Sequence, residues 1–356
     1  MQIMELLSHI GIYPSTLNLT LTNKFKGFLL IWVFIKFILV NGWVNLHLFL
    51  WNWVSNWIGF KWVITITYNI KLIISLWFWQ SLIYLINKRK IKIIISGLDL
   101  NNDLEKLKIL NESNCLCLSN HRSLFDFILI YYIKTLVAKK SNHAANNGNT
   151  TLDSIDLNFI NWNSIWRIPS LHTIWNFLTN DENWVIQPNQ LELQLNQIIN
   201  QNNELTDLKS NWFIHFPEVN IINDYSLALQ NQQLDQYLIP KLNETLYPRF
   251  KNFNNIVSTI TKINNNTASS SSNQFKNLID FSIVYYNPLQ NNFKNPNLFE
   301  ILTLKQPFFI INIDIKFKLI SKLPLREKKL EKWLEHLWLE KDKTIEMMQK
   351  QLKINE

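Results

Sequence analysis

Residues 120–126 read Asn-His-Arg-Ser-Leu-Phe-Asp and place an imidazole five residues before a carboxylate. A hydroxyl attacks an acyl donor efficiently at neutral pH only when a base removes its proton, and histidine ionises in the range that suits this task. A buried carboxylate bonded to the other ring nitrogen holds the imidazole in one tautomer and stabilises the imidazolium that forms. His121 and Asp126 are therefore candidates for a general base and its orienting partner.

The spacing of the two residues predicts where they lie. Residues five apart on one helix diverge by ~140°, so we expect His121 in the turn after a strand (115–119) and Asp126 in the first turn of the helix that contains the apolar run 127–138. Ser123 to Asp126 also fits a capping box, in which Asp126 satisfies backbone donors at the helix start. The pattern alone leaves capping and catalysis equally open, and the two roles are compatible.

Other chemistries lack their motifs. None of the 6 Gly falls in a dinucleotide fingerprint, a P-loop or a hydrolase nucleophile elbow, and no spacing of His, Cys or acidic residues is typical of a metal site, so we expect no metal. Cys115 and Cys117 lie too close on one strand to bridge each other. The formal charge of +8 implies an anionic partner, which could be nucleic acid, a lipid surface or a phosphorylated substrate.

The first 86 residues differ in character from the rest. Stretches 27–50 and 62–86 are apolar and aromatic, and each is long enough to cross a bilayer, which takes ~20 residues. Interfacial or re-entrant helices, or the buried helices of a soluble core, are the alternatives. The basic run Asn87 to Lys90 favours a cytoplasmic location for the rest of the chain. We expect a membrane-anchoring, membrane-embedded helical region over 1–86.

Residues 87–356 alternate between strand and helix patterns, which predicts an α/β domain with a mixed sheet flanked by helices. We expect strands at 91–96, 115–119, 211–216, 279–286 and 309–319. Residues 264–273 form a low-complexity Asn/Ser insertion, which we expect to be disordered. The end of the chain is predicted to be an amphipathic helix that docks on its own domain.

Several motifs in a consistent order resemble the glycerophospholipid acyltransferase family. Asn120-His121-x-Ser123-x-x-Asp126 is similar to its first motif, Arg167-Ile168-Pro169 to its proline-containing motif, and Phe216-Pro217-Glu218 to its Phe-Pro-Glu-Gly-Thr motif. Segments 246–249, 279–285 and 333–343 resemble the carboxy-terminal region of the lysocardiolipin and lysophosphatidylinositol acyltransferase branch.

The resemblance implies a function and a set of roles. It implies fatty acyl transfer from acyl-CoA, as co-substrate, to the free hydroxyl of a lysophospholipid with an inositol- or glycerol-bearing head group, at the cytoplasmic face of an endoplasmic reticulum membrane, with no cofactor and no nucleic acid. His121 would be the general base and Asp126 its partner. The implied turn-shaping and substrate-binding residues are Asn120, Ser123, Arg167, Phe216, Pro217, Glu218 and Asn220.

Departures from the family pattern motivate a second hypothesis. Val219-Asn220-Ile221 replaces the family's Gly and, as in several members of the branch, its phosphate-binding Arg, and the Gly expected near 170–172 is also absent. Loss of the Arg removes a bidentate anion donor and argues against lysophosphatidic acid as acceptor. The alternative function is a catalytically degenerate membrane scaffold of the same fold, acting in membrane or wall assembly.

Overall fold

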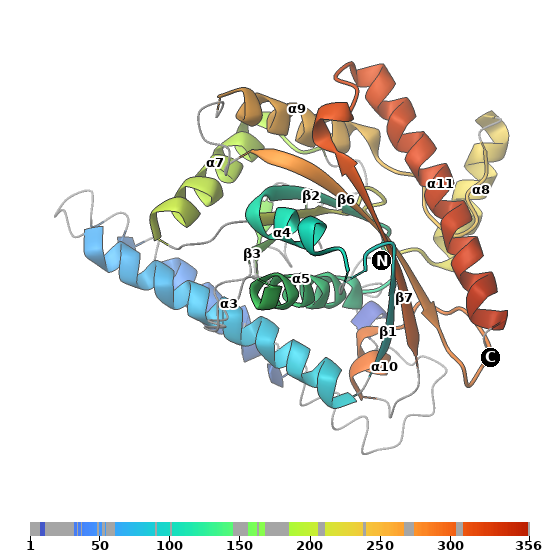
Figure 1. Cartoon of the computed structure of the whole chain (residues 1–356), viewed down its shortest axis with the longest axis horizontal. Coiled ribbons are helices and arrows are strands. Elements are labelled where there is room, and N and C mark those ends of the chain that lie inside the picture. The colour runs from blue at the N-terminus through green and yellow to red at the C-terminus, as the bar shows by residue number, and fades with distance from the viewer. Residues whose placement is uncertain are drawn as a thin grey trace.

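The chain folds around one seven-stranded mixed sheet with helices on both faces (Figure 1). The computed structural model describes residues 8–10, 32–33, 35–36, 38–47, 50–51, 54, 61–89, 91–99, 102–144, 156–161, 164–167, 185–205, 211–237, 240–266, 274–303 and 309–354. The predicted α/β class, with a mixed sheet flanked by helices, is confirmed.

The sheet has the order β1-β7-β6-β2-β5-β3-β4. Its strands are β1 (Lys92–Ser96), β2 (Asn114–Ser119), β3 (Asp156–Asn161), β4 (Ser164–Trp166), β5 (Asn211–His215), β6 (Phe275–Tyr286) and β7 (Ile310–Leu319). Strands β6, β2, β5 and β3 run parallel, while β7 is antiparallel to β6 and β4 is antiparallel to β3. All six residues of β2 are buried, as expected for a central strand covered on both faces.

Two layers of helices cover the sheet. One face packs against α3 (Lys61–Arg89), α4 (Leu104–Glu112), α5 (Phe125–Ala144) and α10 (Leu298–Thr303). The other face packs against α7 (Pro188–Leu205), α9 (Phe250–Asn266), the short helix η1 (Ile320–Lys322) and α11 (Glu327–Ile354). Helix α8 (Asp224–Tyr237) comes after the loop that leaves β5. The two thiols, Cys115 and Cys117, face the α5 layer as buried, free cysteines, and burial raises the pKa of both.

The predicted insertion at 264–273 begins inside a helix. Residues 264–266 are the last turn of α9, and the Asn264 amide bonds both the N–H and the C=O of Phe275 at 2.8 and 2.9 Å. This side chain therefore joins the end of α9 to the start of β6. The rest of the insertion lies outside the described residues, as does the proline of the 167–169 motif.

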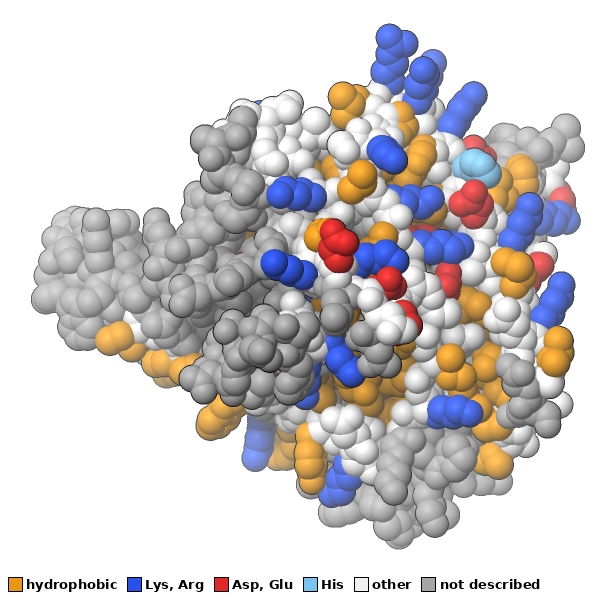
Figure 2. Space-filling view, in the orientation of Figure 1, with side chains coloured by type: hydrophobic (Ala, Val, Ile, Leu, Met, Phe, Trp, Pro, Cys, Tyr) orange, Lys and Arg blue, Asp and Glu red, His pale blue; other side chains and the backbone are white. Residues whose placement is uncertain are grey.

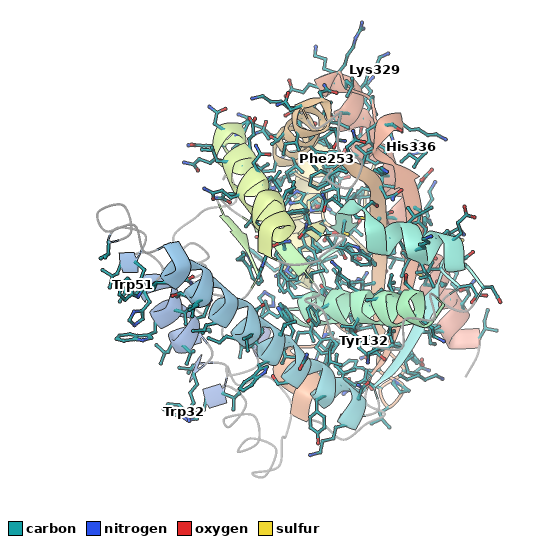
Figure 3. All side chains as sticks on the ribbon, turned by 60° about the vertical axis from the view of Figure 1, so that its left-hand side comes forward. Trp32, Trp51, Tyr132, Phe253, Lys329 and His336 are labelled. Atoms are coloured by element: carbon teal, nitrogen blue, oxygen red, sulfur yellow. The ribbon has the colours of Figure 1, made fainter. Side chains whose placement is uncertain are left out.

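Helix α3 lies along α5 and carries apolar side chains on both of its sides. Phe78, Trp79 and Leu82 are buried, and the Trp79 ring stacks on Tyr131 of α5 at 4.7 Å. On the opposite side Ile66, Ile70, Ile73 and Trp77 are exposed, at the spacing of one helical stripe. Trp32 and Trp51, also exposed, lie on the outer side of α3 away from the sheet (Figure 3). Among the described helices, none combines the length and the apolar character needed to cross a bilayer.

Candidate functional site

The candidate site lies at the carboxyl ends of parallel strands β2 and β5. Residues 120–124 connect β2 to α5, and residues 216–223 leave β5 beside them. The two loops are joined where the N–H of Ile222 donates to the C=O of His121 at 3.0 Å. Ligand sites in open α/β sheets form at this end of the strands.

His121 and Asp126 are in direct contact. The Nδ1 atom of His121 lies 3.0 Å from Oδ2 of Asp126, and the two side chains are 7% and 0% exposed. Helix α5 begins at Phe125, so His121 stands in the turn before the helix and Asp126 in its first turn, as the spacing predicts. A buried carboxylate at Nδ1 keeps the proton on that nitrogen and leaves Nε2 as an acceptor.

Asp126 also binds the backbone of the turn. Its Oδ2 accepts the N–H groups of Arg122 at 2.7 Å and Ser123 at 2.9 Å. Ser123 caps the helix as well, because its Oγ accepts the N–H of Phe125 at 3.1 Å. The carboxylate therefore satisfies backbone donors at the helix start and orients the imidazole, so the capping and catalytic interpretations describe one arrangement.

Tyr285 of β6 completes the shell of Asp126, and the sequence did not single it out as a site residue. Its hydroxyl donates to Oδ1 of Asp126 at 2.5 Å. Burial, followed by the negative charge of Asp126, raises the pKa of Tyr285 well above its ordinary value, so the phenol stays protonated as a donor. The sequence predicts a strand at 279–286 that contains Tyr285 but carries no signal for this contact.

Asn120 and Ser123 fix the turn to the rest of the fold. The amide of Asn120 pairs with Ile283 of β6, accepting its N–H at 2.8 Å and donating to its C=O at 3.0 Å. The Ser123 hydroxyl donates to the C=O of Pro296 at 2.7 Å. Both side chains hold the backbone around His121, in keeping with the turn-shaping role expected of them.

Aromatic rings surround the imidazole. Phe216 lies 4.4 Å and Phe127 5.3 Å from the His121 ring, centroid to centroid. Phe127 continues into a cluster with Phe159 and Trp166 at 4.9 and 5.3 Å. In the part of the chain that the structure describes, Nε2 of His121 has no hydrogen-bond partner. The imidazole therefore lies in largely apolar surroundings.

Glu218 is turned into the protein. Its two oxygens accept the backbone N–H of His121 at 3.4 Å and the indole N–H of Trp338 of α11 at 3.2 Å, and the residue is 2% exposed. Burial raises the pKa of Glu218 to about 8. Beside it, the C=O of Pro217 accepts the N–H of Arg249 at 2.8 Å, which joins two segments of the family resemblance.

The turn after Glu218 has a backbone conformation that favours glycine, but the residue there is Val219. Val219 has φ 66°, in the left-handed region, and the Asn220 N–H reaches the C=O of Glu218 at 2.8 Å. A β-branched side chain is unfavourable at positive φ. Val219 therefore holds a backbone conformation typical of glycine under local strain.

Arg122, next to His121, is linked to α11 through one loop. Its guanidinium donates to the side chain and to the C=O of Glu244, both at 2.7 Å. Asp342 of α11 holds that loop by accepting the N–H groups of Asn243 and Glu244 and the hydroxyl of Thr245, at 3.1, 2.8 and 3.0 Å. The last helix of the chain therefore supports both Glu218 and Arg122.

Arg167 lies apart from this group. Its Nε donates to Asn158 of β3 at 3.0 Å, and its C=O accepts the indole N–H of Trp79. Its neighbour Trp166 contacts Phe127, whose ring lies against that of His121. The structure thus brings together the predicted residues of the 120–126 and 216–220 segments and places Arg167 on the β4 side of the aromatic cluster.

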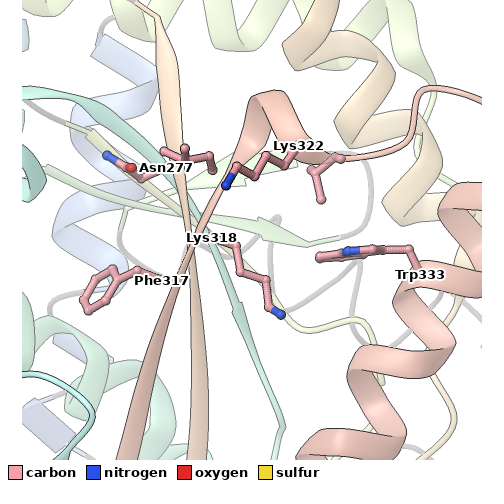
Figure 4. Close-up of a pocket in the computed structure, with 7 residues that line it drawn as sticks. Asn277, Phe317, Lys318, Lys322 and Trp333 are labelled. Atoms are coloured by element: carbon pink, nitrogen blue, oxygen red, sulfur yellow. The ribbon is translucent and has the colours of Figure 1, made fainter.

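A pocket of about 410 Å³ lies at the opposite end of the sheet (Figure 4). It is lined by Asn277, Phe317, Lys318, Leu319, Lys322, Leu323 and Trp333. Asn277 precedes Ile283, the partner of Asn120, by six residues on β6, so the pocket is ~20 Å from His121. Lys and Arg side chains stand out at this end, where α11 begins (Figure 2). No three His, Cys, Asp or Glu side chains of the described residues gather as metal ligands would.

Comparisons of the chain with models of protein families, with curated proteins and with solved structures gave no match in any of the three.

Proposed function

We propose that the protein is an acyl-CoA-dependent O-acyltransferase that acylates the free hydroxyl of a lysophospholipid with an inositol- or glycerol-bearing head group. The observation that carries the proposal is the contact of His121 Nδ1 with a fully buried Asp126 at 3.0 Å, beside a strand end and inside aromatic walls. This arrangement is that of a general base held in one tautomer. The aromatic rings of Phe127 and Phe216 beside His121 suit an apolar acyl chain better than a polar substrate group.

In the proposed reaction Nε2 of His121 takes the proton of the acceptor hydroxyl as its oxygen attacks the thioester carbonyl of acyl-CoA. The carbon–oxygen bond forms, the tetrahedral intermediate collapses, and the carbon–sulfur bond breaks. The imidazolium returns its proton to the leaving thiolate, which gives the ester and CoA. Asp126 stabilises the imidazolium in between. No step requires a metal or a covalent acyl-enzyme.

We propose the bilayer as the surface on which this occurs. The exposed stripe of Ile66, Ile70, Ile73 and Trp77 on α3, with the exposed Trp32 and Trp51, supports embedding of the amino-terminal helices in the lipid interface. Lys88, whose ammonium lies over the Tyr84 ring at 5.7 Å, stands near the end of that helix and would face anionic headgroups. In this proposal the membrane is that of the endoplasmic reticulum and the site faces the cytoplasm.

The test is acyl transfer by purified membranes or by protein in lipid vesicles. Labelled acyl-CoA is supplied with lysophosphatidylinositol, lysophosphatidylglycerol, lysocardiolipin or lysophosphatidic acid, and the labelled product is measured. His121→Ala should abolish transfer, whereas His336→Ala, on α11 with a side chain 74% exposed, should leave it unchanged. Activity that survives in His121→Ala refutes the mechanism.

A second candidate function, a membrane scaffold of the same fold, is favoured by the state of the 216–220 turn. Both oxygens of Glu218 are bound by protein donors, and Val219 occupies a glycine conformation. Absence of turnover with the whole lysolipid and acyl-CoA panel, together with normal cellular function of His121→Ala, would favour this candidate.

A further inference from the structure

We infer that Tyr285 is a positioning residue that sets the charge distribution of Asp126 and, through it, the basicity of His121. The inference rests on the proposed function of the site. The two carboxylate oxygens of Asp126 have different hydrogen-bond partners. Oδ2 accepts two backbone N–H groups and contacts His121, whereas the hydroxyl of Tyr285 is the one donor that the described residues give to Oδ1.

The phenol is well placed for this role. Tyr285 and Asp126 are both 0% exposed, so water does not replace the hydroxyl when it is removed. The strand fixes the ring, because Tyr285 pairs with Ile311 of β7 and packs in the core under α5. A hydrogen bond to one oxygen draws negative charge away from the other, and the carboxylate then attracts the imidazolium less strongly.

The other charged groups near the pair are engaged elsewhere. The Arg122 guanidinium is held by Glu244, Glu218 contacts the backbone of His121, and Lys341 of α11 pairs with Asp280 of β6. Within the described part of the chain, Tyr285 is therefore the side-chain donor to Asp126 besides His121 itself.

A matched pair of variants isolates this contact. Tyr286 is the next residue after Tyr285 on β6, is equally buried, and faces α11. Its hydroxyl donates to Asn291, in the loop after β6, at 3.1 Å. Tyr285→Phe and Tyr286→Phe each remove one buried phenolic hydroxyl from the same strand. Only the first changes the donors of Asp126.

Two readouts are measured for both variants. The first is the pH profile of kcat/KM for acyl transfer. In Tyr285→Phe we expect its acid limb to move up by about one pH unit, with a loss of kcat/KM that approaches about tenfold at the pH values well below that limb. The second, which needs no substrate, is deuterium exchange at the imidazole carbon of His121, followed by mass spectrometry against pH. We expect its midpoint to move upward by the same interval, with His336 as the internal reference and Tyr286→Phe unchanged.

The outcomes separate the two proposals. An exchange midpoint that moves only in Tyr285→Phe, in a protein without acyl transfer, supports the positioning role and refutes the proposed function. A folded Tyr285→Phe protein with the wild-type midpoint overturns the inference, and so does an equal shift in Tyr286→Phe. If Tyr285→Phe does not fold, 3-fluorotyrosine at position 285 replaces it. This stronger donor should move the midpoint downward, and an unmoved midpoint overturns the inference.

Discussion

Replacing Glu218 by glutamine tests whether this carboxyl group is neutral inside the fold. Burial raises its pKa from 4.5 to about 8, while hydrogen bonds from His121 and Trp338 and the charges of Lys341 and Arg122 offset only part of that effect. Between these two pH values the folded protein keeps a proton that the unfolded chain has released. The stabilisation is thus fully present below pH 4.5 and is lost as pH rises through 8. At ~1.4 kcal/mol per pKa unit, the loss by pH 9 is roughly 5 kcal/mol.

Glutamine has the same shape and no charge, so its contribution does not change with pH in this range. It keeps one acceptor oxygen for Trp338 and presents its amide group to the N–H of His121, which costs about 1 kcal/mol. We therefore expect Glu218→Gln to be less stable than the wild type by about 1 kcal/mol below pH 4 and more stable by roughly 4 kcal/mol at pH 9. The two stability curves should cross.

The assay is urea unfolding followed by tryptophan fluorescence at several pH values from 4 to 9. The difference between the two proteins is the quantity of interest, because the other titrating groups contribute equally to both. Glu105→Gln, at an exposed position on α4, serves as the control and should run parallel to the wild type. If the curve of Glu218→Gln also runs parallel across the range, the carboxyl group is not buried in its neutral form and the reasoning is wrong.

Three further changes test other parts of the structure. Val219→Gly should raise the free energy of unfolding by about 0.5 kcal/mol, because relief of the backbone strain at φ 66° exceeds the conformational entropy that glycine adds to the unfolded chain. Val219→Ala should raise the free energy of unfolding by less in the same urea assay. If alanine stabilises the protein more than glycine, the backbone at this position is not strained. Asp126→Asn should lower kcat/KM for acyl transfer by roughly 10³-fold while circular dichroism stays that of the wild type, because the imidazolium loses its counter-charge; a loss below tenfold would argue against the pair. Trp77→Asn, which changes a ring 67% exposed on α3, should weaken co-sedimentation with anionic vesicles roughly tenfold. The matched change Tyr225→Asn on α8, 73% exposed, should not.

The sequence predicts the parts of the fold that depend on local pattern. Apolar runs and alternation located β2, β6, β7 and the helices next to them, because burial on one or both faces leaves a periodic trace. The turn geometry at His121 came from spacing alone. The contacts of Asp126 with Tyr285, and of Glu218 with Trp338, join residues 159 and 120 positions apart, and pattern carries no information on such pairings. For the same reason the sequence does not predict that the side chains of Glu218 and Arg167 form hydrogen bonds with other residues of the protein.

The support that α11 gives to the site has a consequence for the order in which the protein is made. His121 precedes Trp338 and Asp342, which hold Glu218 and the Glu244 loop, by more than half the length of the sequence. Strands and helices around β2 can pair as they emerge from the ribosome, whereas the contacts of Glu218 and of the Glu244 loop with α11 must wait for that helix to be made and to dock. A nascent chain therefore lacks these supports of the His121 turn until α11 has been synthesised.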